Sequence, residues 1–267
     1  QKYKTLKTQC NHNNEIGMPQ TLFGLDSSYE AAVIEMGMSH QGEISRMSMS
    51  CQPDVAVITN IGISHIENLG TQENILKAKL EILDGAAYDA PLILCRDDKL
   101  LAGVQLHSDR KVYYYSVSKK DCDVYASGVK TVGNSITFTI SYEGGKIAAQ
   151  ISCLGGLNVK TALALDIPPE DIVKVIAQFK PEGLRQNVTV IDGVTYIVDC
   201  YNAAPDSMKA SLSVLSQAQA EGKRICVLGD MLELGKNSKT YRRNVGEYVA
   251  ASKDDLRYCL GADTKCY

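Results

Sequence analysis

Strand-length apolar runs that alternate with helix-length segments are the feature that most limits how this sequence can fold. Residues 31–35 and 55–61 are near-continuous apolar runs, and residues 91–95 repeat the pattern. Such runs suit parallel strands that are buried on both faces of a sheet. Residues 74–84 have the apolar spacing of a helix, and Thr71 is available as its N-cap. This order predicts an α/β fold with a mostly parallel sheet.

The pattern changes in the second half of the chain. Residues 135–142 alternate with period two, and a Gly-containing turn leads into residues 147–151, which predicts an antiparallel hairpin at one edge of the sheet. A polar stretch with Pro and Gly then covers residues 180–186, and strand–helix order resumes beyond it. We therefore predict two α/β domains, residues 1–186 and residues 187–267.

Composition excludes several functional classes. The chain of 267 residues has 28 Lys and Arg against 31 Asp and Glu, a net charge of −3, so a protein that binds nucleic acid through a basic surface is not expected. No apolar stretch approaches the roughly 20 residues of a membrane span. The nine cysteines form no CxxC pair, which favours reduced core thiols in a cytoplasmic protein over disulfides or a zinc site.

Lys79 is the most informative single position. Helical spacing places it between Ile75 and Leu83 on the apolar face of the predicted helix, whereas Lys77 falls on the opposite face. A buried ammonium is costly, and desolvation lowers its pKa, so the neutral amine could act as a nucleophile or take up carbon dioxide as a carbamate. The alternative is that Lys79 extends to the edge of the helix and reaches water.

Glu35 and His65 each lie at or just beyond the carboxyl end of an apolar run. Open α/β sheets bind ligands at the carboxyl ends of their strands, so both side chains could face one crevice. A carboxylate and an imidazole could together hold a divalent cation such as Mg²⁺, which keeps several waters and bridges phosphates. The alternative for His65 is a hydrogen bond within its own loop.

Two further residues complete the list of candidate site residues. Arg185 lies at the predicted domain junction, where a guanidinium could bridge phosphates, and Asp199 follows the apolar run at residues 195–198. A surface arginine and a helix-capping aspartate are the alternatives. The sequence contains no GxxxxGK[ST] phosphate loop and no GxGxxG after a strand.

With these residues in view, the sequence resembles the Mur ligases. The resemblance extends from about residue 8 to residue 250 in the order of that family, and several segments are typical of its D-Ala-D-Ala-adding member. The matching segments are residues 11–19 (NHNNEIGMP), 35–38 (EMGM), 42–44 (GEI), 58–67 (ITNIGISHIE), 78–82 (AKLEI), 183–186 (GLRQ), 199–202 (DCYN), 205–208 (PDSM) and 227–235 (VLGDMLELG).

The resemblance implies a central domain with a P-loop-type sheet and a partial Rossmann-like C-terminal domain. It implies ATP-dependent joining of D-Ala-D-Ala to UDP-N-acetylmuramoyl-tripeptide through an acyl phosphate, with Mg²⁺ as cofactor, in a cytoplasmic protein that we expect to be a monomer. Carbamylated Lys79 and His65 are the implied catalytic residues. The implied binding residues are Glu35, His65 and Lys79 for magnesium, Asn158, Arg185 and Asp199 for ATP, and Asn13, Asn14 and Asn202 for the substrates.

The sequence departs from the family pattern at several points. The P-loop and the N-terminal domain of the family are missing, and Leu157 and Thr161 replace a His and an Asn of the family's HNxxNAL segment. We therefore expect this sequence to be part of a longer chain. The alternative is a non-catalytic Mur-ligase-like binding protein that lost its P-loop. The NNEIG and DCYN segments argue against a third reading, a ligase of the same fold with another substrate, such as a folylpolyglutamate or cyanophycin-type enzyme.

Overall fold

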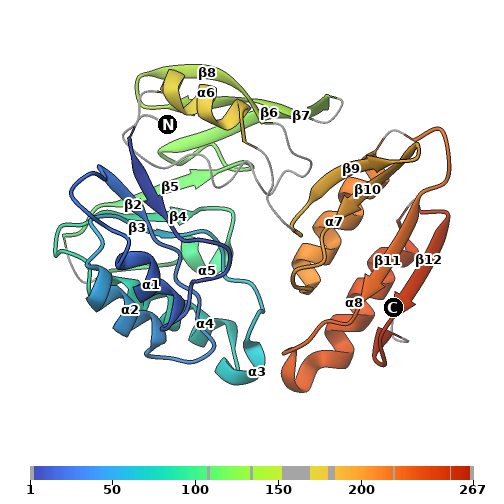
Figure 1. Cartoon of the computed structure of the whole chain (residues 1–267), viewed down its shortest axis with the longest axis horizontal. Coiled ribbons are helices and arrows are strands. Elements are labelled where there is room, and N and C mark those ends of the chain that lie inside the picture. Colours follow the sequence, from blue (N-terminus) through green and yellow to red (C-terminus); the bar gives the residue numbers. More distant parts are fainter. Residues whose placement is uncertain are drawn as a thin grey trace.

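Figure 1 shows the chain as a computed structural model. The structure describes residues 3–106, 109–132, 135–151, 169–179, 184–218, 220–252 and 254–264.

A six-stranded sheet forms the centre of the first part of the chain. Its strand order is β3-β4-β5-β6-β7-β8. The four strands from β3 to β6 are parallel, and β6, β7 and β8 pair antiparallel, so the predicted mostly parallel sheet with an antiparallel edge is confirmed. The strands are β3 (Ala56–Ile58), β4 (Leu92–Cys95), β5 (Val112–Ser116), β6 (Val124–Val132), β7 (Ser135–Tyr142) and β8 (Gly145–Ile151).

Short helices cover the parallel half of this sheet (Figure 1). The predicted helix over residues 74–84 is α4 (Gln72–Leu80) followed by a 3-10 turn, η1 (Glu81–Leu83), and the Thr71 side chain accepts a hydrogen bond from Asn74 N as the predicted N-cap. The other helices are α1 (Gly17–Leu22), α2 (Glu43–Cys51), α3 (Ile66–Leu69) and α5 (Lys99–Ala102).

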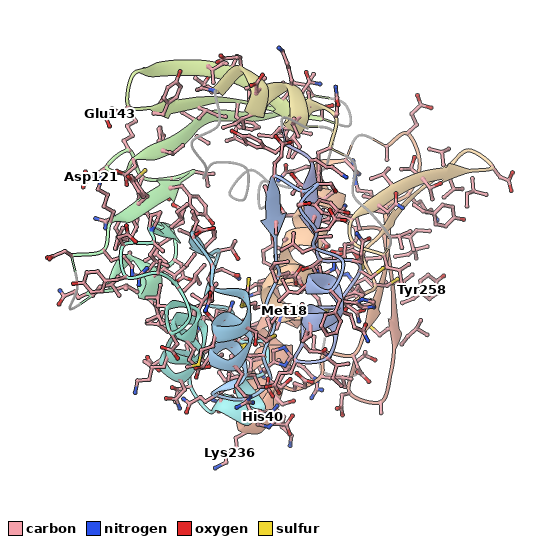
Figure 2. All side chains as sticks on the ribbon, turned by 60° about the vertical axis from the view of Figure 1, so that its left-hand side comes forward. Met18, His40, Asp121, Glu143, Lys236 and Tyr258 are labelled. Atoms are coloured by element: carbon pink, nitrogen blue, oxygen red, sulfur yellow. The ribbon has the colours of Figure 1, made fainter. Side chains whose placement is uncertain are left out.

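The core lies between β4 and these helices. All four residues of β4 are buried, as expected for a parallel strand covered on both faces. Met18 of α1 and Ile75 of α4 are also fully buried in the same cluster. Figure 2 labels Met18 in the interior, whereas Tyr258 projects from the outer face of the C-terminal part.

A separate two-stranded parallel sheet pairs β1 (Thr5–Lys7) with β2 (Ala31–Val33). The sequence predicts a strand here, but its prediction that the strand is buried on both faces is wrong, because Val33 is 58% exposed. Within the described residues, β2 pairs with β1 alone, so no second neighbour shields its other edge.

The antiparallel edge includes one strand that the sequence analysis did not predict. β6 pairs with both β5 and β7, and its pairing with β7 shifts register between Ser127 and Lys130. β7 and β8 form the predicted hairpin. Helix α6 (Pro169–Ala177) lies against β8 (Figure 1).

The C-terminal part has two small sheets and two long helices. The hairpin of β9 (Asn187–Ile191) and β10 (Val194–Val198) turns at Asp192 and Gly193, which both have positive φ as a tight hairpin turn requires. β11 (Ile225–Gly229) and β12 (Leu256–Leu260) are parallel. The remaining elements are α7 (Pro205–Gln217), η3 (Gly235–Asn237) and α8 (Ser238–Ala250).

Among the described residues, no helix combines the length and the apolar character that crossing a bilayer requires.

The described cysteines are free thiols, but the expectation of core thiols is only partly confirmed. Cys95 and Cys226 are buried, whereas Cys10, Cys200 and Cys259 are exposed.

Candidate active site

The Lys79 amine lies where the loops after β3 and β4 meet. Its Nζ donates a hydrogen bond to the Asn60 carbonyl oxygen at 2.7 Å. Asp98 joins the same region, because its Oδ2 accepts a hydrogen bond from Ile61 N at 2.7 Å while its Oδ1 caps α5. The site therefore lies at the carboxyl ends of adjacent parallel strands, as Glu35 and His65 were predicted to do.

The environment of Lys79 makes its charged form less favourable than that of a lysine in water. The residue is half-buried, less than the helical spacing predicted, while Lys77 is exposed as expected. Burial lowers the pKa of the Lys79 amine, and the negative charge of Asp98 partly opposes this effect. In the described part of the chain the amine makes no ion pair, so a carbonyl oxygen is its closest partner.

Glu35 is fixed by the loop that precedes α1. Its Oε1 accepts a hydrogen bond from Asn13 Nδ2 at 2.8 Å, and its backbone N–H donates to Thr8 Oγ1 at 2.8 Å. Gly37 packs against the Asn13 amide so closely that a Cβ there would lie 2.9 Å from it. One hydrogen bond thus joins a predicted metal ligand to a predicted substrate-binding residue.

Asn14 has a structural contact of its own. Its Oδ1 accepts hydrogen bonds from Gly17 N at 2.8 Å and from Ile16 N at 3.1 Å, which satisfies backbone donors at the start of α1. Its carboxamide oxygen is therefore already engaged, and a role in substrate binding would fall to its N–H groups.

His65 lies at the N-terminus of α3 and faces the C-terminal part of the chain. Its Nδ1 is 2.5 Å from Glu233 Oε2. Nδ1 is buried and forms no aligned hydrogen bond, so the two atoms are in close contact without a linear hydrogen bond. His65 also has a left-handed backbone, with φ of 61°.

The predicted nucleotide residues lie around the start of the C-terminal part. The Arg185 guanidinium stacks 4.3 Å from the centre of the Tyr201 ring, and Asp199 accepts a hydrogen bond from the Ser211 hydroxyl of α7. Asn202 is exposed just before α7. Asn158 lies outside the described residues.

The structure thus joins some predicted residues and leaves others apart. Asn13 contacts Glu35, but no described contact joins Glu35, His65 and Lys79 to one another. The sequence analysis missed Asp98 and Glu233. Asp98 follows the buried strand β4, so the strand-end rule that selected Glu35 could have found it, whereas nothing in the sequence pairs Glu233 with His65.

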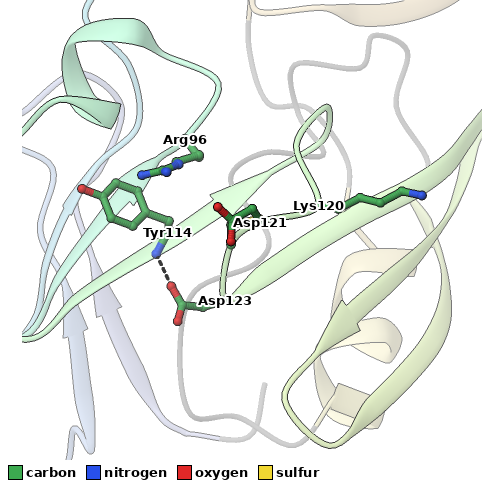
Figure 3. Close-up of a pocket in the computed structure, with 6 residues that line it drawn as sticks. Arg96, Tyr114, Lys120, Asp121 and Asp123 are labelled. Carbon is green, nitrogen blue, oxygen red and sulfur yellow. Dashed lines mark hydrogen bonds between the residues drawn. The ribbon is translucent and has the colours of Figure 1, made fainter.

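A shallow pocket of about 380 Å³ lies elsewhere, beside β5 and β6 (Figure 3). The Arg96 guanidinium stacks 4.8 Å from the Tyr114 ring centre, and Asp123 Oδ2 accepts a hydrogen bond from Tyr114 N at 2.6 Å. None of the predicted site residues lines it. The lining residues are Arg96, Tyr114, Lys120, Asp121, Cys122 and Asp123.

Comparison with protein families decides the relationship. The model of the Mur ligase middle domain matches residues 1–165, and that of the Mur ligase glutamate ligase domain matches residues 185–265. The chain belongs to the Mur ligase family. The predicted resemblance is confirmed.

Individual Mur ligases are similar over almost the whole of this chain. The UDP-N-acetylmuramoyl-tripeptide–D-alanyl-D-alanine ligase of Bacillus subtilis is 36% identical over 97% of the chain and 57% of its own length. The Escherichia coli ligase of the same name is 32% identical over 96% and 58%. The chain thus spans little more than half the length of these relatives.

Solved structures agree. A crystal structure of MurF from Acinetobacter baumannii superposes with a TM-score of 0.91 at 30% identity, covering 99% of this chain and 59% of that one. MurF ligase from Thermotoga maritima in complex with ADP gives a TM-score of 0.85 at 26% identity, covering 99% and 62%. This similarity confirms the predicted mixed α/β fold with its mostly parallel central sheet.

Proposed function

We propose that the protein containing this chain is an ATP-dependent ligase that joins D-Ala-D-Ala to UDP-N-acetylmuramoyl-tripeptide in peptidoglycan synthesis. The relatives of that name support the substrates, and the ADP complex of a similar structure supports the nucleotide. The observation that carries the proposal is the half-buried Lys79 amine at the carboxyl ends of β3 and β4, with its lowered pKa and no ion-pair partner among the described residues. A non-catalytic binding protein would not require this costly arrangement.

The donor set suits magnesium by its chemistry, and Lys79 would have to supply the third ligand, because the described residues contain no group of three or more His, Cys, Asp or Glu side chains that could hold a metal ion. Glu35 supplies a carboxylate and His65 an imidazole, and a carbamate on Lys79 would replace a repelling ammonium by two more oxygen donors. An amine whose pKa is lowered by burial is suited to take up carbon dioxide. Bound magnesium would supply neutralisation of phosphate charge during phosphoryl transfer.

The remaining residues have roles in binding and orientation. The tripeptide carboxylate attacks the γ-phosphorus of ATP, ADP leaves, and the resulting acyl phosphate is attacked by the amine of D-Ala-D-Ala with release of phosphate. We assign Asn158, Arg185 and Asp199 to nucleotide binding. We assign Asn13, Asn14 and Asn202 to substrate binding. Asn13 would also hold Glu35 in place through its side-chain hydrogen bond.

We further propose the division into residues 1–186 and 187–267, a monomeric state and a cytoplasmic location. The division is supported by the two family models, of which one ends at residue 165 and the other begins at residue 185. Size-exclusion chromatography with light scattering of the full-length protein tests the monomer directly, and a dimer mass would contradict it.

The deciding experiment measures ADP release by the full-length protein with ATP, the UDP-linked tripeptide and D-Ala-D-Ala. We expect sustained ADP release to require both peptide substrates, because without D-Ala-D-Ala the acyl phosphate is not consumed and release stops after about one turnover. Lys79→Ala should abolish it, and a short added carboxylate should partly restore it by occupying the position of the carbamate.

Lys77→Ala is the matched control, because Lys77 lies on the same helix but is exposed, and this variant should retain activity. Unchanged activity in Lys79→Ala would contradict the carbamate, and absence of ADP release from the wild-type protein would favour the non-catalytic alternative.

A further inference from the structure

The loop after β11 reaches across to the residue at the N-terminus of α3. Glu233 of this loop places its Oε2 2.5 Å from His65 Nδ1. Neither residue is glycine, yet both have left-handed backbones, with φ of 59° for Glu233 and 61° for His65. Such conformations are costly and persist where surrounding contacts impose them. Both left-handed residues thus lie at the contact between the two segments.

Backbone contacts hold the same two segments together. Glu67 N–H donates a hydrogen bond to the Glu233 carbonyl oxygen at 3.3 Å. Gly235 packs so closely that a Cβ there would lie 3.1 Å from Glu67 Cα. Met231 and Leu234, on either side of Glu233, are buried and anchor the loop, whereas Glu233 itself is exposed.

Helix α8 also supports the loop after β11. The buried Arg242 of α8 donates from Nη2 to the Met231 carbonyl oxygen at 2.8 Å and forms an ion pair with Asp263 at 3.0 Å. An arginine that contacts both a loop carbonyl and a distant carboxylate fixes the loop to the C-terminal part. Glu233 is thus presented by a supported loop.

We propose that Glu233 is a positioning residue that orients the His65 ring. This inference rests on the proposed function, in which His65 is a magnesium ligand. A histidine that binds metal through one nitrogen usually donates the other N–H to a carboxylate, a backbone carbonyl or water, which fixes its tautomer and its orientation. Here Nδ1 faces Glu233, so Nε2 is the nitrogen left for magnesium. A small ring rotation would convert the close approach into an aligned hydrogen bond.

Glu233 and the proposed metal ligands come from different parts of the chain. Glu35, Lys79 and His65 all belong to the first part of the chain, whereas Glu233 comes from the C-terminal part. The His65 ring is therefore held in its orientation only while the loop after β11 lies against α3. Docking of the C-terminal part and preparation of the metal site are thereby coupled.

The test uses full-length protein with two readouts that do not depend on turnover. The first is the affinity for Mn²⁺ alone, measured by electron paramagnetic resonance of the free ion. The second is the nitrogen-15 spectrum of the metal-free His65 ring, assigned with His65→Ala, which reports the tautomer. We expect the wild-type ring to carry its proton on Nδ1.

Glu233→Ala should weaken Mn²⁺ binding about 10- to 100-fold and shift the ring toward a mixture of tautomers. Glu233→Gln should retain most of both, because its carbonyl oxygen can still accept a hydrogen bond from Nδ1–H; a role limited to packing or net charge would not give this pattern. Glu247→Gln, an exposed glutamate of α8, is the control and should change neither readout.

The outcomes separate the two proposals. Unchanged Mn²⁺ affinity and an unchanged ring spectrum in Glu233→Ala, with affinity lost in His65→Ala, would overturn the positioning role and leave the magnesium assignment intact. Unchanged Mn²⁺ affinity in His65→Ala would overturn the magnesium assignment and, with it, the role of Glu233 toward the metal.

Discussion

One added methyl group at Gly235 should disturb the contact between the loop after β11 and α3. Gly235 has φ of +60°, and a Cβ there would lie 3.1 Å from Glu67 Cα and 3.6 Å from Glu67 N. Gly193, in the turn of the β9–β10 hairpin, is the matched control. It has φ of +78°, but a Cβ there would meet nothing within 4 Å. Both alanine variants have the left-handed backbone in common, and only one meets a steric clash.

The expected magnitude follows from this difference. A left-handed L-residue costs about 1–2 kcal/mol, which applies to both variants. Only at Gly235 is the new carbon closer than the 3.5–4.0 Å at which carbon atoms attract, so the segments must separate by a few tenths of an ångström. The hydrogen bond from Glu67 N to Glu233 O is already 3.3 Å long, and its loss costs about 0.5–1.5 kcal/mol. Gly235→Ala should be less stable than Gly193→Ala by that amount.

Two measurements test this expectation. Urea unfolding compares the free energies of unfolding of the two variants. Hydrogen exchange of the Glu67 amide reports on the contact itself, and its protection should fall about two- to tenfold in Gly235→Ala, as the loss of 0.5–1.5 kcal/mol implies. In Gly193→Ala the protection should remain. Equal stabilities together with equal Glu67 protection would refute the contact.

Three further predictions concern stability. Burial raises the pKa of Cys226 from 9.0 to about 11, and Asp254 adds to the effect, so the folded thiol keeps a proton that the unfolded one loses. The free energy of unfolding, measured with urea, should therefore fall as pH rises from 9 toward 11, and it should fall less steeply in Cys226→Ala. Leu94→Ala, in fully buried β4, should cost about 2–5 kcal/mol in urea unfolding, whereas a loss below about 1 kcal/mol would contradict its place in the core. Thr71→Ala removes the cap of α4 and should cost about 1 kcal/mol by the same assay, and a neutral effect would show that the cap is dispensable.

Elements with a strong local signal could be predicted from the sequence. β4 is a continuous apolar run, and all its residues are buried. An Asp-Gly pair between two apolar runs is typical of a hairpin turn, and Asp192 and Gly193 both have the positive φ that such a turn needs. In these elements neighbouring residues carry the information, so the chain need not be folded for the pattern to be visible.

Elements whose order depends on distant partners could not be predicted. β6 contains Ser127, Gly128 and Lys130 and reads as an irregular polar segment. It becomes a strand because β5 and β7 flank it on both sides. For β2 the strand was predicted, but its burial on both faces was not correct. An apolar run indicates a strand but does not show how many neighbours will cover it.

In the candidate site, the sequence predicted the functional side chains but not their partners. The strand-end rule selected Glu35 and His65, and helical spacing selected Lys79. Their partners are a carbonyl oxygen of Asn60 and a carboxylate of Glu233. A backbone oxygen has no sequence signal, and Glu233 lies in a part of the chain that meets His65 only after folding.

The proposed metal ligands differ in whether their position depends on the C-terminal part of the chain. Glu35 is held by Asn13 and Lys79 by Asn60, both within the first part of the chain, so these two ligands are placed when that part folds. His65 alone depends on a residue from the C-terminal part. A cation held by Glu35 and Lys79 could therefore bind before the C-terminal part docks, while full coordination would wait for docking. Weakening the contact at Gly235 should then lower metal affinity through His65 alone, and it should have no further effect once His65 is replaced by alanine.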